Sequence, residues 1–443
     1  MDARRRGFGM RPWERIPARL RRPLAAVSLL GAATFGGAGL VFVAQTLLAR
    51  RLGPDTFGLF ASALATVTML APLAGFGLNA FRLKAYGVEG WGAHRWLRPS
   101  LRFGTATTLL AMAAVVAYAL TAAPADGTRF ALLALVPVIP GMAALGALGN
   151  KFRLEERFGA MAVAQVVVPA GRLLVVALLF VLPMRDVRFV AAGYGVVSLL
   201  AIAWALPQLR QLARDRIDLK GHGPRPALHG AEPAIPGVRA LWPEVWAFGM
   251  FAVLYPVFFQ VGTPLLKHLS GNAQAGFYGL GLAVLMAVYL IPWTVYQKFL
   301  NANRHRWAAH DRPKFWRVHR YGQWSMTLLG VLIALALAAC AHWVVPPLFG
   351  EAYRPVAGIL LVLAPCIPLR FLSTATGAAL LTGDHMRYRV LAITLATAVI
   401  VGLDLLLIPR FHAHGAAVAA VAGEAVMLLA TWYAVRRFVP RER

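Results

Sequence analysis

The sequence predicts an all-α membrane protein of about twelve transmembrane helices in two six-helix lobes, and two observations support this fold class. First, hydrophobic residues make up 59% of the 443 residues, and only 14% are charged. With Gly counted and Tyr left out, the apolar share is about 66%, against about 45–50% in soluble domains, so lipid must cover part of it. Second, the apolar residues form long runs that basic loops separate.

Twelve runs are long enough to cross about 30 Å of hydrocarbon as a helix. The first six lie near 24–49, 57–81, 103–123, 130–149, 160–182 and 189–207, and the second six near 245–266, 276–297, 323–344, 356–381, 390–408 and 415–435. The first run is longer than the apolar part of a cleaved signal peptide, about 7–15 residues, so we expect it to remain as a membrane span.

The distribution of Lys and Arg predicts the orientation of the chain. The termini and every second connection carry 35 of the 45 Lys and Arg residues, and the alternate connections carry 8. Because basic residues gather in cytoplasmic loops, both termini are predicted to be cytoplasmic. We expect five parts: a basic cytoplasmic arm (1–23), an N-terminal lobe (24–207), a cytoplasmic linker (208–243), a C-terminal lobe (244–435) and a basic cytoplasmic tail (436–443).

A weak internal repeat relates the two halves. Residues 47–52 resemble residues 265–269, and residues 58–60 resemble residues 276–278. In each half the two segments lie at the first outer loop. Six spans return the chain to the same side of the membrane. The halves should therefore be parallel repeats about an axis along the membrane normal.

Charge, loop length and motifs exclude several function classes. A net charge of +27 suggests nucleic-acid binding in a soluble protein, but here the basic residues lie between spans, so we expect no nucleic-acid partner. Membrane glycosyltransferases need a large soluble surface with acidic groups, whereas the outer loops here have about ten residues or fewer. The one acidic pair in the loops, Glu155–Glu156, is expected in a solvated inner loop. With no phosphate-binding Gly-rich loop and no metal-ligand spacing, we expect neither an enzyme nor a metal or other cofactor.

Four ionisable residues lie inside the predicted spans, where a charge is costly and marks a candidate functional site. Arg172 is near the middle of the fifth run, Arg370 of the tenth and Glu424 of the twelfth, and Asp404 is about one turn from the outer end of the eleventh. One arginine in each half predicts a shared central cavity whose guanidinium groups bind a phosphate. The alternative is that the arginines pair with Glu424 or Asp404 and hold helices together.

Arg370 follows Pro365 and Pro368, whose missing N–H donors predict a broken helix of the kind found at transporter sites. Glu424 and Asp404 are candidates for coupling transport to a proton or cation. For Glu424 the alternative is a helix–helix contact, and for Asp404 a solvated position near the outer interface.

Polar side chains in the spans and basic side chains at their inner ends complete the candidate site. The polar ones are expected to bind sugar hydroxyls or to form hydrogen bonds between helices. Arg82 and Lys84 are expected to attract an acidic head group, with ordinary positive-inside charge as the alternative. The polar candidates are Gln45, Asn79, Gln165, Gln260 and Thr263.

Several stretches resemble the polysaccharide-exporter (Wzx-like lipid-linked oligosaccharide flippase) family of the multidrug/oligosaccharidyl-lipid/polysaccharide exporter superfamily. They read ARRLGPDTFGLF at 49–60, LAGFGLN at 73–79, LFGEAYRP at 348–355, LLLIPRF at 405–411 and HGAA at 414–417, with Glu424 beyond. The resemblance implies a MATE-like fold. Two positions depart from the family pattern: Asp404 stands where Asn is frequent, and His412 where Gly is common.

Members of that family move undecaprenyl-diphosphate-linked oligosaccharides across the bacterial inner membrane by alternating access. The resemblance therefore implies a multi-pass inner-membrane flippase for a cell-surface polysaccharide repeat unit, such as that of an O-antigen, lipopolysaccharide or exopolysaccharide. Its expected partners are the lipid-linked oligosaccharide and membrane lipids, with a polymerase and other assembly proteins as candidates. Two alternatives stay open: an ion-coupled drug antiporter of the same superfamily, and a non-transporting scaffold of polysaccharide assembly.

Overall fold

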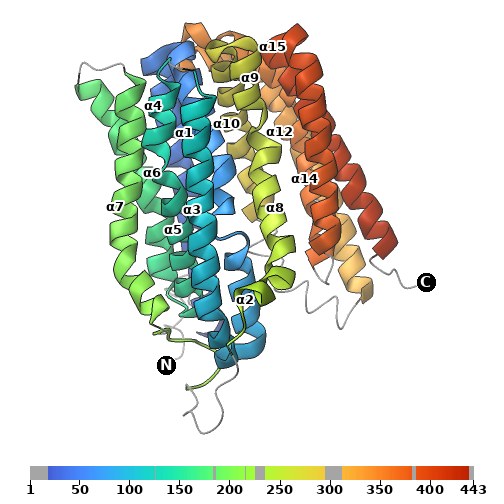
Figure 1. Ribbon diagram of the computed structural model, residues 1–443. Helices are drawn as coiled ribbons and strands as arrows, with labels where there is room; N and C mark the ends of the chain where they lie inside the picture. Colours follow the sequence, from blue (N-terminus) through green and yellow to red (C-terminus); the bar gives the residue numbers. More distant parts are fainter. Residues whose placement is uncertain are drawn as a thin grey trace, which may run out of the picture.

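The computed structural model describes residues 18–124, 126–182, 186–214, 216–224, 235–294, 312–381 and 386–438. Throughout these residues the regular structure is helical, without a β-strand. Long helices stand side by side, and short ones close the two ends of the bundle (Figure 1). The predicted all-α fold is confirmed.

The first half of the chain forms α1 to α7. The longest element, α1, is two helices joined at Gly53, whose φ of 75° and ψ of 172° are available to a residue without Cβ. The elements are α1 (Ala18–Leu70), η2 (Ala71–Leu73), α2 (Leu78–Glu89), η3 (Gly90–Trp96), α3 (Leu97–Thr121), α4 (Thr128–Leu135), α5 (Val138–Leu154), α6 (Phe158–Val181) and α7 (Val187–Ala213).

The second half forms α8 to α15. Its tenth predicted run is broken between α13 and α14 at Pro365, which confirms the break expected there. The last helix, α15, is two helices joined at His412. The elements are η4 (Val238–Leu241), α8 (Trp242–Gln260), α9 (Gly262–Ser270), α10 (Asn272–Thr294), α12 (Arg312–Phe349), η6 (Glu351–Tyr353), α13 (Pro355–Leu363), α14 (Cys366–Gly377), η7 (Ala378–Leu381) and α15 (Met386–Phe438).

Nine helical segments among the described residues are long and apolar enough to cross a membrane. Two of them, Ala25–Thr121 and Met386–Phe438, far exceed the roughly 20 residues of one crossing and contain the breaks at Gly53 and His412. Large apolar side chains on the outside of the bundle suit lipid; Leu200, for example, is 64% exposed. The chain is a multi-pass membrane protein, and the count of twelve spans stays a prediction.

Connections that the charge pattern assigns to one side of the membrane lie together in space. At the end that carries α2 and η3, called here the inner end, Lys220 N donates to the carbonyl oxygen of Leu154 (3.1 Å). At the opposite end, called the outer end, Lys267 Nζ lies 3.6 Å from an Asp126 carboxylate oxygen. Figure 1 shows α2 at the lower end and α9 at the upper. Which end faces the cytoplasm stays a prediction from Lys and Arg.

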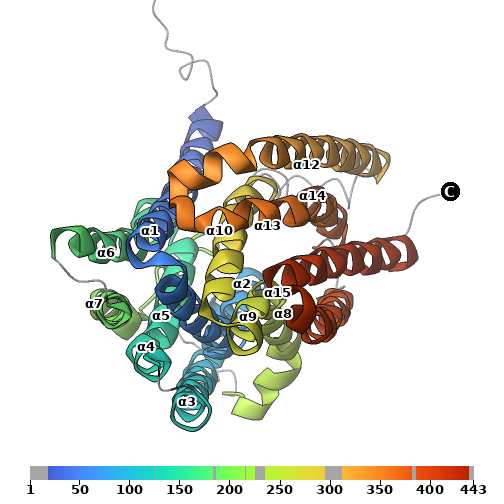
Figure 2. The ribbon, with the colours of Figure 1, turned by 90° about the horizontal axis from the view of Figure 1, so that it is seen from above.

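The helices form two groups that meet along a seam. Seen from the outer end, α3 to α7 lie on one side, α12, α14 and α15 lie on the other, and parts of α1, α8, α9, α10 and α13 lie between them (Figure 2). Buried residues of both groups, such as Phe60 and Phe371, belong to one continuous apolar core. We call α1 to α7 the first group and α8 to α15 the second; the predicted lobe boundaries at 207 and 244 stay predictions.

Candidate functional site

A buried ion pair lies inside the second helix group. Arg370 Nη2 on α14 is 2.7 Å from Glu424 Oε1 on α15, and Arg370 Nε donates to the same oxygen at 3.0 Å. Both side chains are less than one tenth exposed. The guanidinium carbon lies 4.4 Å from the ring centre of Phe259 and 5.5 Å from that of Tyr289. Of the two anions that the sequence left open for Arg370, the protein carboxylate is the one the structure places beside it.

Glu424 keeps one oxygen outside that pair. Glu424 Oε2 is buried and has no hydrogen-bond partner among the described residues. Beside Glu424 is a cavity of about 10 Å³, also lined by Tyr278, Tyr289 and Cys366. Such a volume holds about one water molecule. This cavity therefore has room for a water molecule but is too small for a sugar or a diphosphate.

Asp404 is buried, so the expectation of a solvated position is wrong. Its side chain is 1% exposed, and neither carboxylate oxygen has a hydrogen-bond partner in the part of the chain that is described. The reason is that other helices cover it: a Cβ atom at Gly262 of α9 would lie 3.3 Å from both Asp404 Oδ2 and the hydroxyl of Tyr278 on α10. Of the two acids predicted at membrane depth, Asp404 is the less neutralised, because Glu424 has Arg370 beside it.

Arg172 lies in the first helix group, apart from Arg370. Its guanidinium carbon on α6 is 4.9 Å from the ring centre of Tyr194 on α7, and Tyr194 packs edge-on against Phe60 of α1 at 5.1 Å. Arg172 Nε has no hydrogen-bond partner within the described ranges. Each arginine is thus held by its own group, and the shared cavity they were expected to line stays a prediction.

Two of the polar candidates form hydrogen bonds between helices. Thr34 on α1 donates to Gln165 on α6 at 3.0 Å, inside the first group. Thr68 on α1 donates to Gln260 on α8 at 2.7 Å, across the seam. Both amide oxygens are therefore engaged by threonine in this conformation.

The remaining polar candidates have different surroundings. The backbone oxygen of Asn79 accepts a bond from Asn150 on α5 at 3.0 Å. Thr263 is buried on α9, whereas Gln45 on α1 is half-buried. A sugar-binding role stays a prediction for all five.

The two inner-end cations differ in their partners. Lys84 Nζ lies 3.7 Å from Glu244 on α8, so it joins the two groups at the inner end. Arg82 lines a small cavity with Ser100, and Arg82 Nε lacks a hydrogen-bond partner in the described chain. Arg82 is thus the inner-end cation with the greater capacity for an added anion.

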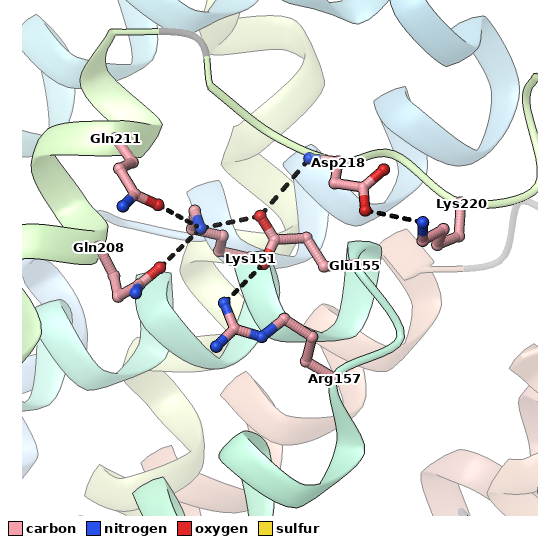
Figure 3. A network of polar contacts seen from close by, with 7 residues as sticks. All are labelled: Lys151, Glu155, Arg157, Gln208, Gln211, Asp218 and Lys220. Atoms are coloured by element: carbon pink, nitrogen blue, oxygen red, sulfur yellow. Dashed lines mark hydrogen bonds and ion pairs between the residues drawn. The ribbon is translucent and has the colours of Figure 1, made fainter. Parts of the chain in front are cut away.

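Sequence reasoning missed a buried lysine at the inner end. Lys151 of α5 is 2% exposed, and its ammonium donates to Glu155 at 2.8 Å, to Gln208 at 2.8 Å and to Gln211 at 3.2 Å (Figure 3). Three acceptors match the three hydrogens of the ammonium group. The Lys-x-x-x-Glu spacing on one helix was the available signal, because residues four apart face each other.

Glu155 is also buried, so the expectation that both acids of this loop are solvated is wrong for it. Its carboxylate lies 3.4 Å from Arg157 and accepts a weak bond from the backbone N–H of Asp218 at 3.5 Å. The side chain of Asp218 in turn lies 2.7 Å from Lys220 (Figure 3). This network fastens residues 216–220, which lie within the predicted linker, to the inner end of the first group.

A cross-seam cluster closes the outer end. Lys267 on α9 is 7% exposed and donates to the hydroxyl of Thr128 on α4, beside Asp126. Next to it, Tyr118 on α3 lies 2.5 Å from His268 Nε2. This cluster joins α3 and α4 of the first group to α9 of the second.

The cluster shifts the ionisation of its members. Burial lowers the pKa of Lys267, and Asp126 opposes that effect. Burial also lowers the pKa of His268, and the charge of Lys267 adds to the shift. Burial raises the pKa of Asp126, but its hydrogen bond to Thr128 and the charge of Lys267 outweigh this, so the pKa is lowered. All three shifts favour the deprotonated form when the outer end is closed.

No metal centre is evident among the described residues, since no three His, Cys, Asp or Glu side chains gather there in a metal-binding arrangement. A helical membrane bundle of two groups, with buried charges in each and inter-group contacts at both ends, has the architecture of a membrane transporter. Comparison with protein families specifies the class further. Residues 24–292 match the family described as polysaccharide biosynthesis protein, and the chain belongs to this family.

Solved structures show the same fold at low sequence identity. The lipid II flippase MurJ in an inward closed conformation has a TM-score of 0.68 and 12% identity, over 92% of this chain and 87% of that one. An inward-facing multidrug resistance MATE transporter of the MOP superfamily has a TM-score of 0.66 and 13% identity, over 94% and 97%. The eukaryotic MATE transporter AtDTX14 has a TM-score of 0.61 and 13% identity, over 94% and 96%. Comparison with curated proteins gives no match. The MATE-like fold is confirmed.

Proposed function

We propose that this protein is a flippase of the bacterial inner membrane that moves a polyprenyl-diphosphate-linked oligosaccharide by alternating access. The observation that carries the proposal is a combination: the family match is to polysaccharide biosynthesis, and the fold is shared with a flippase of lipid II. The oligosaccharide would be the repeat unit of a cell-surface polysaccharide. The five-part division of the chain, with two lobes and a linker, is part of this proposal.

The contacts of the buried cations assign them different roles in this proposal. Arg370 is neutralised by Glu424, so it holds α14 against α15. Arg172 and Arg82 each keep an unpartnered Nε among the described residues, and we assign them to the diphosphate. The cavity beside Arg82 is about 10 Å³ in this closed form, so the diphosphate would bind there only after the seam has opened. A guanidinium group suits this role because it stays charged and can bind two phosphate oxygens at once.

The acids at membrane depth differ in the same way. Glu424 already has a cation at 2.7 Å. Asp404 has no such neighbour in the described structure and is nearly fully buried. Because an isolated buried carboxylate favours uptake of a proton or cation, we assign coupling of transport to Asp404.

A strain that lacks the gene tests this function. We expect loss of the surface polysaccharide and accumulation of its lipid-linked precursor on the cytoplasmic side, with both restored by the wild-type gene. Arg172→Ala should fail to restore export although the protein accumulates normally. Normal polysaccharide together with higher sensitivity to cationic drugs would support the antiporter alternative instead. Restored export by a chain lacking both Arg172 and Arg82 would support the scaffold alternative.

A further inference from the structure

Two glycines meet where α1 crosses α10 near the outer end. A Cβ atom at Gly58 would lie 1.8 Å from the carbonyl oxygen of Asn272, and a Cβ atom at Gly276 would lie 2.4 Å from the carbonyl oxygen of Pro54. Both obstacles are backbone atoms, which no side-chain rotation can move aside. The two helices can therefore approach this closely only because both residues are glycine.

This outer crossing lies on the internal repeat. Gly58 and Gly276 begin the matched segments 58–60 and 276–278 of the two halves. Helix α1 belongs to the first group and α10 to the second, so the crossing joins equivalent positions of the two groups. Rocking of one repeat against the other would therefore have to open or close this contact.

A second close crossing joins the groups near the inner end. A Cβ atom at Gly77 would lie 2.4 Å from the backbone nitrogen of Gly249 on α8. The ring of Phe76 covers Gly249, with Phe76 Cδ1 only 2.3 Å from the position of a Cβ atom there. Phe76 also stacks parallel to Trp242 at 5.6 Å between ring centres. This crossing has an aromatic plug in addition to close backbones.

Phe76, the aromatic plug, lies at a break in the second predicted run, 57–81. Gly75, Phe76 and Gly77 have φ values of 83°, 26° and 79°, so three successive residues have left-handed backbone. That conformation is disfavoured for a residue with a side chain such as Phe76. The break separates α1 from α2 and turns the Phe76 ring into the seam. A run of three such residues is also a place where the chain can bend.

One stretch of the chain takes part in every one of these contacts. The second helix of α1, with η2 and the start of α2, carries Gly58 at the outer crossing and Gly77 at the inner one. Between them, Thr68 donates to Gln260 at 2.7 Å across the same seam. The described seam is therefore closed at both ends along one continuous stretch.

We propose that the crossing of Gly58 with Gly276 is the outer gate of the transport path, and that the crossing of Phe76 and Gly77 with Gly249 is the inner gate. The structure is then the form in which both gates are closed. This inference rests on the proposed function in one respect, that transport proceeds by alternating access. Each gate must then separate while the other stays closed.

Cysteine pairs that report each end test the gates without any substrate. The natural Cys340 and Cys366 are first replaced by Ser and Ala. Thr128→Cys with Lys267→Cys then reports the outer end, because these side chains are hydrogen-bonded across the seam. Lys84→Cys with Glu244→Cys reports the inner end, where the charged atoms are 3.7 Å apart. Because these contacts are made at the ends of long side chains, beyond the reach of a direct disulfide, a short bifunctional reagent that forms a disulfide with each cysteine joins them. Cross-linking yield in membranes is measured for both pairs.

We expect Gly276→Leu to lower the yield of the outer pair about tenfold and to leave the inner pair unchanged. Gly249→Leu should do the reverse. Gly39→Leu is the matched control on α1, because nothing lies within 4 Å of a Cβ atom there, and it should change neither yield. Phe76→Ala adds no bulk, so it tests the inner gate even if Gly249→Leu fails to accumulate in the membrane. It should lower the yield of the inner pair and leave that of the outer pair unchanged.

Two results would overturn the gates. One is equal yields in all variants and the control, and the other is a loss of both pairs with each single substitution. Because cross-linking needs no glycan, separate responses at the two ends combined with normal polysaccharide in the deletion strain would reject the proposed function and leave the gates standing.

Discussion

At the scale of single residues, the buried cations differ in the group that compensates the charge of each one. Arg370 has Glu424, Lys151 has Glu155 with two glutamines, and Arg172 has a tyrosine ring. The sequence identifies these residues as unusual because of their depth or spacing. It cannot show which partner each one meets, since that depends on the rotation and tilt of whole helices.

The buried pair makes a prediction about protein stability. Arg370→Ala should leave Glu424 buried without its cation, which costs about 3–5 kcal/mol, so the level of protein in the membrane should fall. The double variant Arg370→Met with Glu424→Leu should restore that level, because it removes both charges and keeps the volume. Immunoblotting of membranes and thermal denaturation in detergent measure this. Normal abundance of Arg370→Ala with loss of export would instead support contact with substrate.

The outer cluster makes a prediction about pH. The lowered pKa of His268 means that the closed outer end binds a proton less readily than an open one. Closure is therefore favoured above the ordinary pKa of histidine and weakened as the pH falls through it. Burial is the largest cause of the shift, so the effect remains when Lys267 is replaced in the cysteine pair. The yield of the outer cysteine pair divided by that of the inner pair, a ratio that cancels the pH dependence of the thiol reaction itself, should fall between about pH 7.5 and 5.5, around the ordinary histidine pKa. His268→Gln should remove this dependence, and an unchanged slope in that variant would contradict it.

At the scale of elements, breaks in helices determine where side chains point. The break after α13 was predictable, because proline removes a backbone donor. The break at residues 75–77 was not predictable from the sequence, because two glycines in an apolar run are also compatible with a continuous membrane helix. The outer crossing was equally hidden, because a glycine that touches another backbone looks the same in sequence as one facing lipid.

The break in α15 makes a prediction about strain. His412 has a φ of 51° and a ψ of −131°, a conformation that costs a residue with a side chain about 1–3 kcal/mol. His412→Gly should therefore raise the free energy of unfolding by about 1 kcal/mol. Loss of the contact between the His412 ring and the Ser270 hydroxyl, 3.1 Å apart, should reduce this gain slightly. His412→Val should lower stability. Denaturation in one detergent compares the three proteins, and a less stable Gly variant would show that the contact outweighs the strain.

At the scale of the whole molecule, the arrangement is a pair of helix groups with a closed seam between them. Run lengths and the alternation of basic loops predicted the all-helical membrane fold, and contacts at the two ends agree with that alternation. The sequence did not show that residues 216–220 pack onto the first group, because polar and proline-rich composition is the same for docked and free linkers.

Orientation makes a prediction that reporter fusions check. Fusions at residues 220 and 310 should both report cytoplasm, and a fusion at 126 should report periplasm; residue 310 lies outside the described residues. The reason is the excess of Lys and Arg in alternate connections. Opposite sides for 220 and 310 would show that the number of spans between them is wrong.

Transport of a lipid-linked oligosaccharide by the purified protein tests the central claim most directly. Proteoliposomes would carry a polyprenyl-diphosphate oligosaccharide in both leaflets, and a membrane-impermeant oxidant added outside would attack its sugars. The protein cross-linked through Thr128→Cys and Lys267→Cys is the matched control, because its outer end cannot open. We predict that the wild-type protein exposes the whole pool to the oxidant, whereas the cross-linked protein exposes only the outer leaflet until a reductant cleaves the cross-link. Exposure of only the outer leaflet by the wild-type protein would contradict the claim.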